Sequence, residues 1–174
     1  MSENGASRGG QFTVGRLLAD LAATAALAQV LAPALRIGDL VALKGSLGTG
    51  KTAFARALIQ TFLPDEEVPS PTFTLVQTYE TPHFSIVHAD FYRLESPNDV
   101  WELGWDDARG EAVLLVEWAE RLGPALTPRD RLEIEFETIG GADGNEDGAR
   151  RAHLTGFGAW AERLARIGGL HERA

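Results

Sequence analysis

The chain has 174 residues, the length of one domain with a full core, and its 44% hydrophobic and 24% charged content is typical of a globular protein. A net charge of −9 argues against a broad contact with a nucleic-acid backbone, so any role in a nucleic-acid pathway would run through partner proteins. The chain has no cysteine, which excludes disulfides and thiol chemistry, and no apolar run of about 20 residues, so we expect a cytoplasmic protein without a membrane span.

Hydrophobic periodicity predicts alternating helices and strands. In chain order they are a strand at the sheet edge over 11–18, a helix over 21–35, a strand over 40–43, a helix over 53–62, strands over 72–80 and 84–87, a helix over 96–103, strands over 112–116, 131–138 and 150–155, and a helix over 158–167. This alternation, with hairpins late in the chain, predicts an α/β fold: a three-layer sheet of mixed direction with helices on both faces. We expect a flexible tail over 1–10, a single domain over 11–174 and a flexible hairpin loop over 139–149.

One segment, here named the phosphate loop, fits the pattern G-x-x-x-x-G-K-[ST] at every fixed position. Its residues are Gly45, Ser46, Leu47, Gly48, Thr49, Gly50, Lys51 and Thr52. In such loops glycines let backbone N–H groups turn inward towards phosphate, the lysine reaches the β and γ phosphates, and the hydroxyl binds Mg²⁺. The loop predicts a P-loop NTPase-like fold that binds ATP or ADP with Mg²⁺. No Asn-Lys-x-Asp segment occurs, which favours adenine over guanine by elimination.

Two carboxylates close apolar strands, where a magnesium ligand beside such a loop would lie. Asp90 follows the strand containing 85–87, and Glu117 follows 113–116. We assign Asp90 to Mg²⁺, and Glu117 to Mg²⁺, to its shell of water or to the attacking water. Thr72 follows two prolines in a stiff surface segment, and it is either part of a γ-phosphate-sensing loop or the start of a strand. The four histidines lack metal-ligand spacing, and His88 is expected to have a core or strand-end role.

These motifs together resemble the bacterial TsaE (YjeE) family of ATPases. The resemblance rests on the phosphate loop, on Ser70–Val76, on His88–Leu94, and on Val116–Trp118 followed by Arg121 and Leu122. It extends from about Leu18 to Leu154, although the family usually carries an acidic residue where Ser46 stands.

The resemblance implies ATP binding and slow hydrolysis in the threonylcarbamoyl-adenosine modification of tRNA position 37. The implied partners are TsaB and TsaD, with tRNA contacted only indirectly. For individual residues, it implies that Lys51 and Thr52 hold phosphate and metal and that Asp90 and Glu117 serve Mg²⁺ and hydrolysis. It also implies that Thr72 belongs to a switch-like loop. Two further residues would lie beside the nucleotide: Thr24 and Trp118.

Two other functions fit a phosphate loop in a chain of this size. A small-metabolite kinase would need an acceptor pocket and an arginine-bearing lid, for which only Arg121, Arg129 and Arg131 follow Glu117 as a cluster. An ATP-gated binding module would use the nucleotide to order a partner surface, with incidental hydrolysis. Trp101 and Trp105, one helical turn apart, are expected in the core rather than at a ligand.

Overall fold

The computed structural model of the chain describes residues 10–124, 127–139 and 148–170. The expected tail and most of the expected hairpin loop, 1–9 and 140–147, lie outside the described residues, so both remain predictions.

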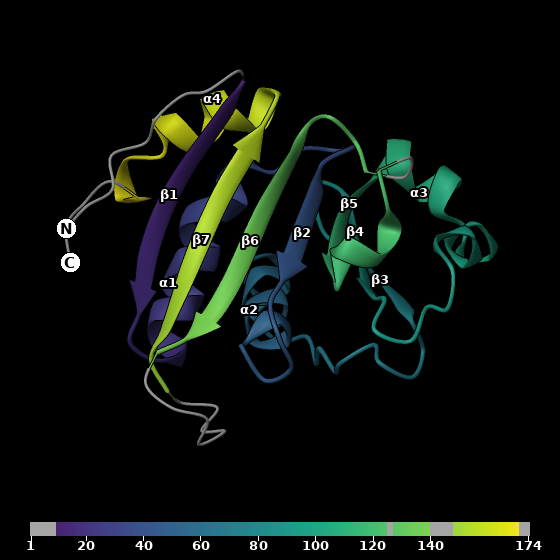
Figure 1. Cartoon of the computed structure of the whole chain (residues 1–174), viewed down its shortest axis with the longest axis horizontal. Coiled ribbons are helices and arrows are strands. Elements are labelled where there is room, and N and C mark those ends of the chain that lie inside the picture. The colour runs from purple at the N-terminus through teal and green to yellow at the C-terminus, as the bar shows by residue number, and fades with distance from the viewer. Residues whose placement is uncertain (1–9, 125–126, 140–147, 171–174) are drawn as a thin grey trace.

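A seven-stranded mixed sheet runs through the molecule in the order β1-β7-β6-β2-β5-β4-β3 (Figure 1). Its strands are β1 (Gln11–Leu18), β2 (Leu40–Lys44), β3 (Val76–Glu80), β4 (Ser85–Asp90), β5 (Ala112–Glu117), β6 (Arg131–Thr138) and β7 (Arg150–Phe157). The four strands β6, β2, β5 and β4 are parallel, whereas β3, β7 and β1 each pair antiparallel with their neighbours. The carboxyl ends of the four parallel strands therefore meet at one edge, the lower edge in Figure 1.

Helices cover both faces of this sheet, which confirms the predicted α/β fold. One face carries α1 (Leu21–Leu31), α2 (Lys51–Phe62) and α4 (Ala159–Arg166), and the short 3-10 turns η1 (Ala32–Ala34) and η4 (Gly168–Leu170) follow α1 and α4. The other face carries α3 (Trp105–Glu111) and the 3-10 helices η2 (Pro97–Leu103) and η3 (Ala119–Leu122) over the β2–β5–β4 half. None of the helices found within the described residues has the length and apolar character needed to cross a membrane.

Side-chain alternation explains how the central strands are buried on both sides. In β2, Val41 and Leu43 pack towards α1 and α2, whereas Leu40 and Ala42 pack towards α3. Every residue of β5 is buried, as its unbroken apolar run predicts for a central parallel strand. β6 instead buries only Leu132, Ile134 and Phe136, so its predicted half-exposed pattern is confirmed over the predicted bounds.

The acidic residues of β6 point to the face opposite α2. Among them, Glu133 accepts hydrogen bonds from Lys44 Nζ and Arg131 Nε, both at 2.7 Å. Burial alone would raise the pKa of Glu133, but these two hydrogen bonds bring it below its usual value of 4.5. The network occupies Lys44, one of the two lysines in the chain, away from the phosphate loop.

The prediction of a strand from Thr72 is wrong at its start, because β3 begins only at Val76. The backbone N–H of Leu75 donates to the carbonyl of Pro71 (2.7 Å), and Leu75 has a φ of 64°, so a turn replaces the first four strand residues. Thr72 is thereby left in a loop, at the carboxyl edge of the sheet.

The segment after β4 is also less regular than predicted. The expected helix over 96–103 is the 3-10 helix η2, which begins with a capping box formed by Ser96 and Asp99. Gly104, with a φ of 75°, then allows a second helix, α3, that the sequence did not predict. Trp105 is buried at 3% exposure, but Trp101 is 44% exposed, so the expectation of a core residue is wrong for Trp101.

Candidate functional site

The phosphate loop connects β2 to α2 at the carboxyl edge of the sheet. Lys51, the first residue of α2, folds back over the loop and donates from Nζ to the carbonyls of Gly45 (2.6 Å) and Ser46 (2.7 Å). The Thr49 hydroxyl also donates to the Ser46 carbonyl (2.9 Å). These hydrogen bonds hold the loop in a closed turn around the lysine ammonium.

Two loop glycines are required by geometry. A Cβ on Gly45 (φ 125°) would lie 2.5 Å from the Phe136 carbonyl oxygen on β6. Gly50 caps α2 with a φ of 103°, and a Cβ there would lie 2.9 Å from Arg150 Nε. The glycine positions of the pattern thus let the loop pass close to the sheet and enter α2 through a left-handed residue.

The ammonium of Lys51 is buried beneath an aromatic ring. Burial lowers the pKa of Lys51 below its usual 10.5, while the charges of Glu117, Glu120 and Asp90 act in the opposite direction. The ring of Trp118 lies 4.1 Å from Nζ, within cation–π distance. A lysine shielded from water in this way interacts more strongly with an anion.

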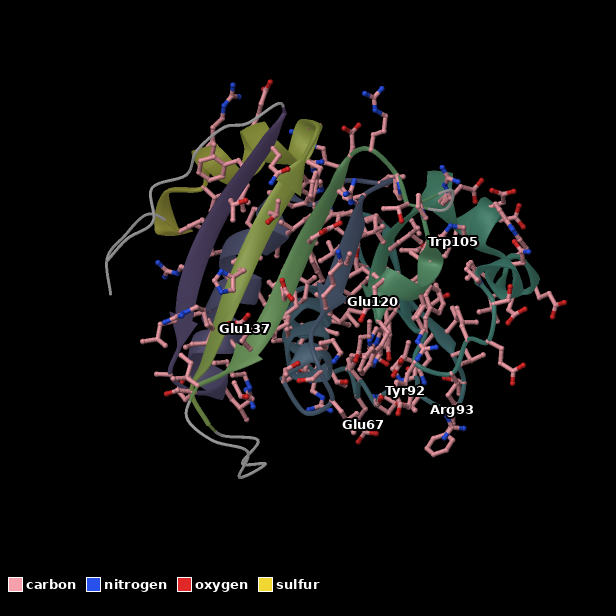
Figure 2. The ribbon with its side chains drawn as sticks, in the orientation of Figure 1. Glu67, Tyr92, Arg93, Trp105, Glu120 and Glu137 are labelled. Carbon is pink, nitrogen blue, oxygen red and sulfur yellow. The ribbon has the colours of Figure 1, made fainter. Side chains whose placement is uncertain are left out.

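Trp118 reaches the loop because the chain turns sharply after β5. It has a φ of 57°, and its backbone N–H donates to the carbonyl of Leu43 at the end of β2 (3.1 Å). Its ring packs against Tyr92 at a centroid distance of 5.0 Å. Figure 2 shows Tyr92 and Arg93 at the lower, carboxyl edge of the sheet, on the side of β4 and β3. The predicted neighbour Trp118 therefore adjoins the predicted phosphate ligand Lys51.

Three side chains from three elements form a hydrogen-bonded row beside the loop. Glu117, at the end of β5, accepts the Thr52 hydroxyl of α2 at Oε2 (2.8 Å) and contacts His88 Nε2 of β4 at Oε1 (2.8 Å). His88 is fully buried and Glu117 is 2% exposed. The structure thus brings two of the three residues predicted to serve Mg²⁺, Thr52 and Glu117, into direct contact.

Asp90 lies opposite Glu117 in the register of the parallel pair β4–β5. Its carboxylate accepts the Thr72 hydroxyl at Oδ2 (3.0 Å) and the backbone N–H of Tyr92 at Oδ1 (2.9 Å). The Thr72 hydroxyl in turn lies 2.6 Å from that of Ser70. The Thr72 hydroxyl therefore bonds to the carboxylate of Asp90, and Thr72 has no place in the strand that was predicted for it.

The hydroxyl and carboxylate oxygens at this edge are suitable ligands for Mg²⁺. In phosphate sites this ion binds such oxygens together with phosphate and water. Thr52 and Glu117 would hold it, with Asp90 on the adjacent strand. In the part of the chain that the structure describes, no three His, Cys, Asp or Glu side chains form a cage that could bind a metal by itself. An ion at this edge would therefore depend on the oxygens of a bound phosphate.

Two other predicted residues, Thr24 and Leu47, take no part in the hydrogen bonds described above. Thr24 is buried in α1, where its hydroxyl donates to the Asp20 carbonyl (3.2 Å) within the same helix. Leu47, at the tip of the loop, is 79% exposed. The loop tip therefore presents an apolar side chain to solvent, and the position of Thr24 beside the nucleotide stays a prediction.

The sequence analysis did not predict the place of two residues at this site. His88 was assigned a core or strand-end role, and it does lie buried at the strand end, but it also contacts Glu117. Arg150 was seen only as the start of a strand, yet its buried guanidinium packs on Gly50 and adds positive charge behind the loop. Alternation along the 85–90 strand could have placed His88 and Asp90 on one face, but nothing in the sequence predicts that β7 begins beside the loop.

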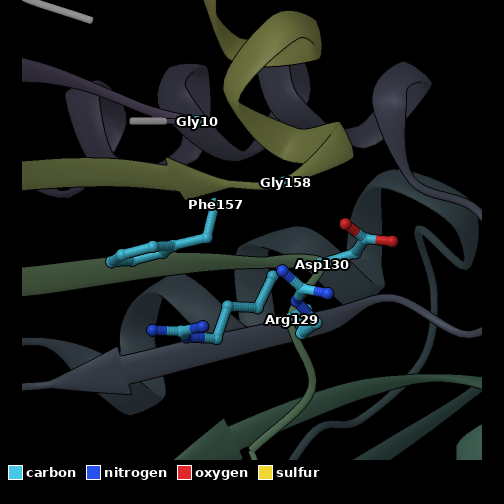
Figure 3. A pocket seen from close by; sticks show the side chains of 6 residues that line it. Gly10, Arg129, Asp130, Phe157 and Gly158 are labelled. Atoms are coloured by element: carbon cyan, nitrogen blue, oxygen red, sulfur yellow. The ribbon is translucent and has the colours of Figure 1, made fainter. Parts of the chain in front are cut away.

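A separate surface pocket of about 440 Å³ lies at the opposite edge of the sheet (Figure 3). It is lined by Gly10, Arg129, Asp130, Arg131, Phe157 and Gly158. Arg131 pairs in register with Leu40 at the start of β2, whereas the phosphate loop follows the end of β2. The pocket is therefore remote from the site described above.

The mixed β-sheet with its four parallel central strands, the phosphate loop leading into α2 and the acidic strand ends define a P-loop NTPase-like protein. Residues 18–146 match the family described as threonylcarbamoyl adenosine biosynthesis protein TsaE. The chain belongs to the TsaE family.

Curated relatives and a solved structure agree with this assignment. The chain is 43% identical to the Rickettsia felis tRNA threonylcarbamoyladenosine biosynthesis protein TsaE over 117 residues, covering 67% of this chain and 68% of the relative. It is 36% identical to the Bacillus subtilis protein of the same name over 118 residues, covering 67% and 73%. The crystal structure of Bacillus subtilis YdiB superposes with a TM-score of 0.74 and 27% identity, covering 96% of this chain and all of that one.

Proposed function

We propose that the chain binds Mg²⁺-ATP and hydrolyses it slowly as the TsaE component of tRNA threonylcarbamoyladenosine biosynthesis. The observation that carries this proposal is the hydrogen bond between Thr52 and Glu117 beside the buried Lys51. It places a hydroxyl, a carboxylate and an ammonium at the edge where a phosphate chain would lie.

Binding would begin with an exchange of hydrogen bonds at Lys51. Its ammonium now donates to two loop carbonyls, and these donors would turn to the β and γ phosphates. The backbone N–H groups of the loop and the positive end of the α2 dipole would hold the same oxygens. The ring of Trp118 would keep water from the ammonium. The bound Mg²⁺ would neutralise phosphate charge as it develops.

Hydrolysis requires a water positioned for attack, and Glu117 is the carboxylate that we propose for this task or for binding the ion. One of its oxygens already faces Thr52, so it would accept a hydrogen bond from a water on the ion or from the attacking water. Asp90 would supply negative charge on the adjacent strand, held in place by Tyr92 N and Thr72. Because Thr72 lies in a loop, its bond to Asp90 could change when a γ phosphate is present.

The names of the curated relatives place them in tRNA threonylcarbamoyladenosine biosynthesis. We propose that this chain works there with TsaB and TsaD homologues. The net charge of −9 disfavours direct binding to a tRNA backbone, so contact with tRNA would be indirect.

The arrangement of the arginines gives no support to a metabolite kinase. Arg131 donates to Glu133 and to the Pro128 carbonyl at the far edge of the sheet. Arg121 donates to the Leu94 carbonyl, and its guanidinium lies over the Tyr92 ring. Arg131 is therefore remote from the phosphate loop, and Arg121 is held by the Leu94 carbonyl in the segment after β4.

The test is ATP hydrolysis by the purified chain, alone and with the TsaB and TsaD homologues of its host, comparing the wild type with Glu117→Ala. Slow turnover that rises with the partners and falls in the variant would support the proposal. Tight ATP binding without hydrolysis under any condition would instead indicate an ATP-gated binding module, and phosphate transferred to an added metabolite would indicate a kinase.

A further inference from the structure

We propose that His88 is a positioning residue: it fixes the carboxylate of Glu117 so that one oxygen stays directed at Thr52 and at the ion that Thr52 would bind. This inference rests on the proposed function and deepens it, because it assigns a role at the same site to a residue that neither the phosphate loop nor the carboxylate pattern includes.

The placement of His88 follows from strand alternation. Ile86, His88 and Asp90 occupy alternate positions of β4, and Ile86 belongs to the core beneath α2. On β5, Val113 and Leu115 belong to the same core, so Glu117 continues the same face. His88 thus stands in the last layer of the core, directly below the polar edge.

The hydrogen-bond pattern defines the direction of the contact. Glu117 already accepts the Thr52 hydroxyl at Oε2, and an ionised carboxylate can only accept, so we assign the proton to Nε2 of His88. Nδ1 of His88 is buried without a hydrogen-bond partner among the described residues, where an N–H would be an unmet donor. With the proton on Nε2, that nitrogen donates to Glu117 and Nδ1 is left as an unpaired acceptor rather than as an unmet donor.

This contact removes freedom that Glu117 would otherwise have. A glutamate side chain has three rotatable bonds, and holding it in one geometry costs conformational entropy. His88 fixes Oε1 from below, is itself fully buried, and cannot swing away without opening the core. Glu117 therefore stands ready for the ion before nucleotide arrives, as preorganised ligands do.

The test uses His88→Leu, which removes the donor, and His88→Gln, which retains an amide donor on a flexible side chain. His83→Leu, an exposed histidine in the turn between β3 and β4, is the matched control. For each protein, ADP binding is titrated through Trp fluorescence with Mg²⁺ and with EDTA, and ATP turnover is measured as a function of Mg²⁺ and ATP concentration. Thermal unfolding is recorded in parallel.

We expect His88→Leu to bind ADP in EDTA within about twofold of the wild type, and to lose about tenfold of the affinity for ADP with Mg²⁺. The kcat should fall by at least about tenfold, the KM for ATP with Mg²⁺ should rise along with the weaker binding, and His88→Gln should recover part of these losses. In a Glu117→Gln background, His88→Leu should have no further effect on the Mg²⁺ dependence, because the carboxylate that it positions is gone.

Unchanged Mg²⁺ dependence and kcat in both folded His88 variants would overturn the inference while leaving the proposed function intact. Equal losses in EDTA and in Mg²⁺, without recovery in His88→Gln, would also overturn it and would indicate a purely structural role. If His88→Leu fails to fold, His88→Gln decides the matter through the same Mg²⁺ titration, alone and in the Glu117→Gln background. A wild-type chain that binds no ADP would refute the proposed function itself.

Discussion

Replacing Lys51 by methionine separates nucleotide binding from folding. In the free protein, the ammonium makes hydrogen bonds of 2.6 and 2.7 Å to loop carbonyls, which stabilise the fold. Burial lowers the pKa of Lys51, which means that burying the charged group destabilises the fold. The two effects oppose each other, and Lys51→Met should change the free energy of unfolding by less than about 1 kcal/mol.

The loss of affinity should be much larger. In the wild type, two hydrogen bonds from the Lys51 ammonium to phosphate oxygens contribute about 3–6 kcal/mol to ADP binding. The ammonium must first break its two hydrogen bonds to loop carbonyls, which costs about 1–2 kcal/mol. The net loss of about 2–4 kcal/mol corresponds to ADP binding that is roughly 30- to 900-fold weaker in Lys51→Met.

The assay is calorimetric titration with ADP and Mg²⁺, with urea unfolding of the same samples. Lys44→Met is the control, because Lys44 is the second lysine in the chain and pairs with Glu133 on the opposite face of the sheet. It should leave the Kd within about twofold and lower stability by about 0.5–1 kcal/mol. A Kd for Lys51→Met within about threefold of the wild type would refute the assignment of the phosphate site.

Four further variants probe the site and the fold. Asp90→Ala should keep most of the ADP affinity while removing Mg²⁺-dependent ATP turnover, and an equal loss of both would contradict its assignment to the metal. Gly50→Ala (φ 103°) brings a Cβ within 2.9 Å of the buried Arg150, so urea unfolding should show a loss of about 2–3 kcal/mol. Gly48→Ala (φ 78°) meets no atom within 4 Å and should lose only about 1 kcal/mol, and equal losses would show that packing is irrelevant there. The folded-state pKa of Glu133 is below 4.5, so its ion pairs stabilise the fold above that pH and cease to do so as pH falls through the folded value. The difference in the free energy of unfolding between the wild type and Glu133→Gln should therefore shrink as pH falls below the usual pKa of 4.5, and a difference that does not change with pH would contradict this reading.

Local patterns predicted much of the fold. The alternation of β6 gave its bounds of 131–138, because one face is buried and the other is not, and the unbroken apolar run of β5 indicated a central strand. The phosphate loop could be recognised because each of its fixed positions has a local reason: glycines for backbone conformation, and Lys51 and Thr52 for chemistry. Errors occurred where local propensity was weak, as at Thr72, where two prolines and a left-handed Leu75 produce a turn instead of a strand.

The sequence by itself thus determined the α/β class, the loop and the two acidic strand ends, since these depend on neighbours within a few residues. Only the tertiary structure decided that β4, β5 and β2 lie next to one another with their carboxyl ends together. That order puts Glu117 between Thr52 and His88, and it brings Arg150 from near the end of the chain against Gly50. Contacts between residues tens of positions apart are fixed by the pairing of strands and the packing of the core, and a single sequence carries no local pattern that specifies them.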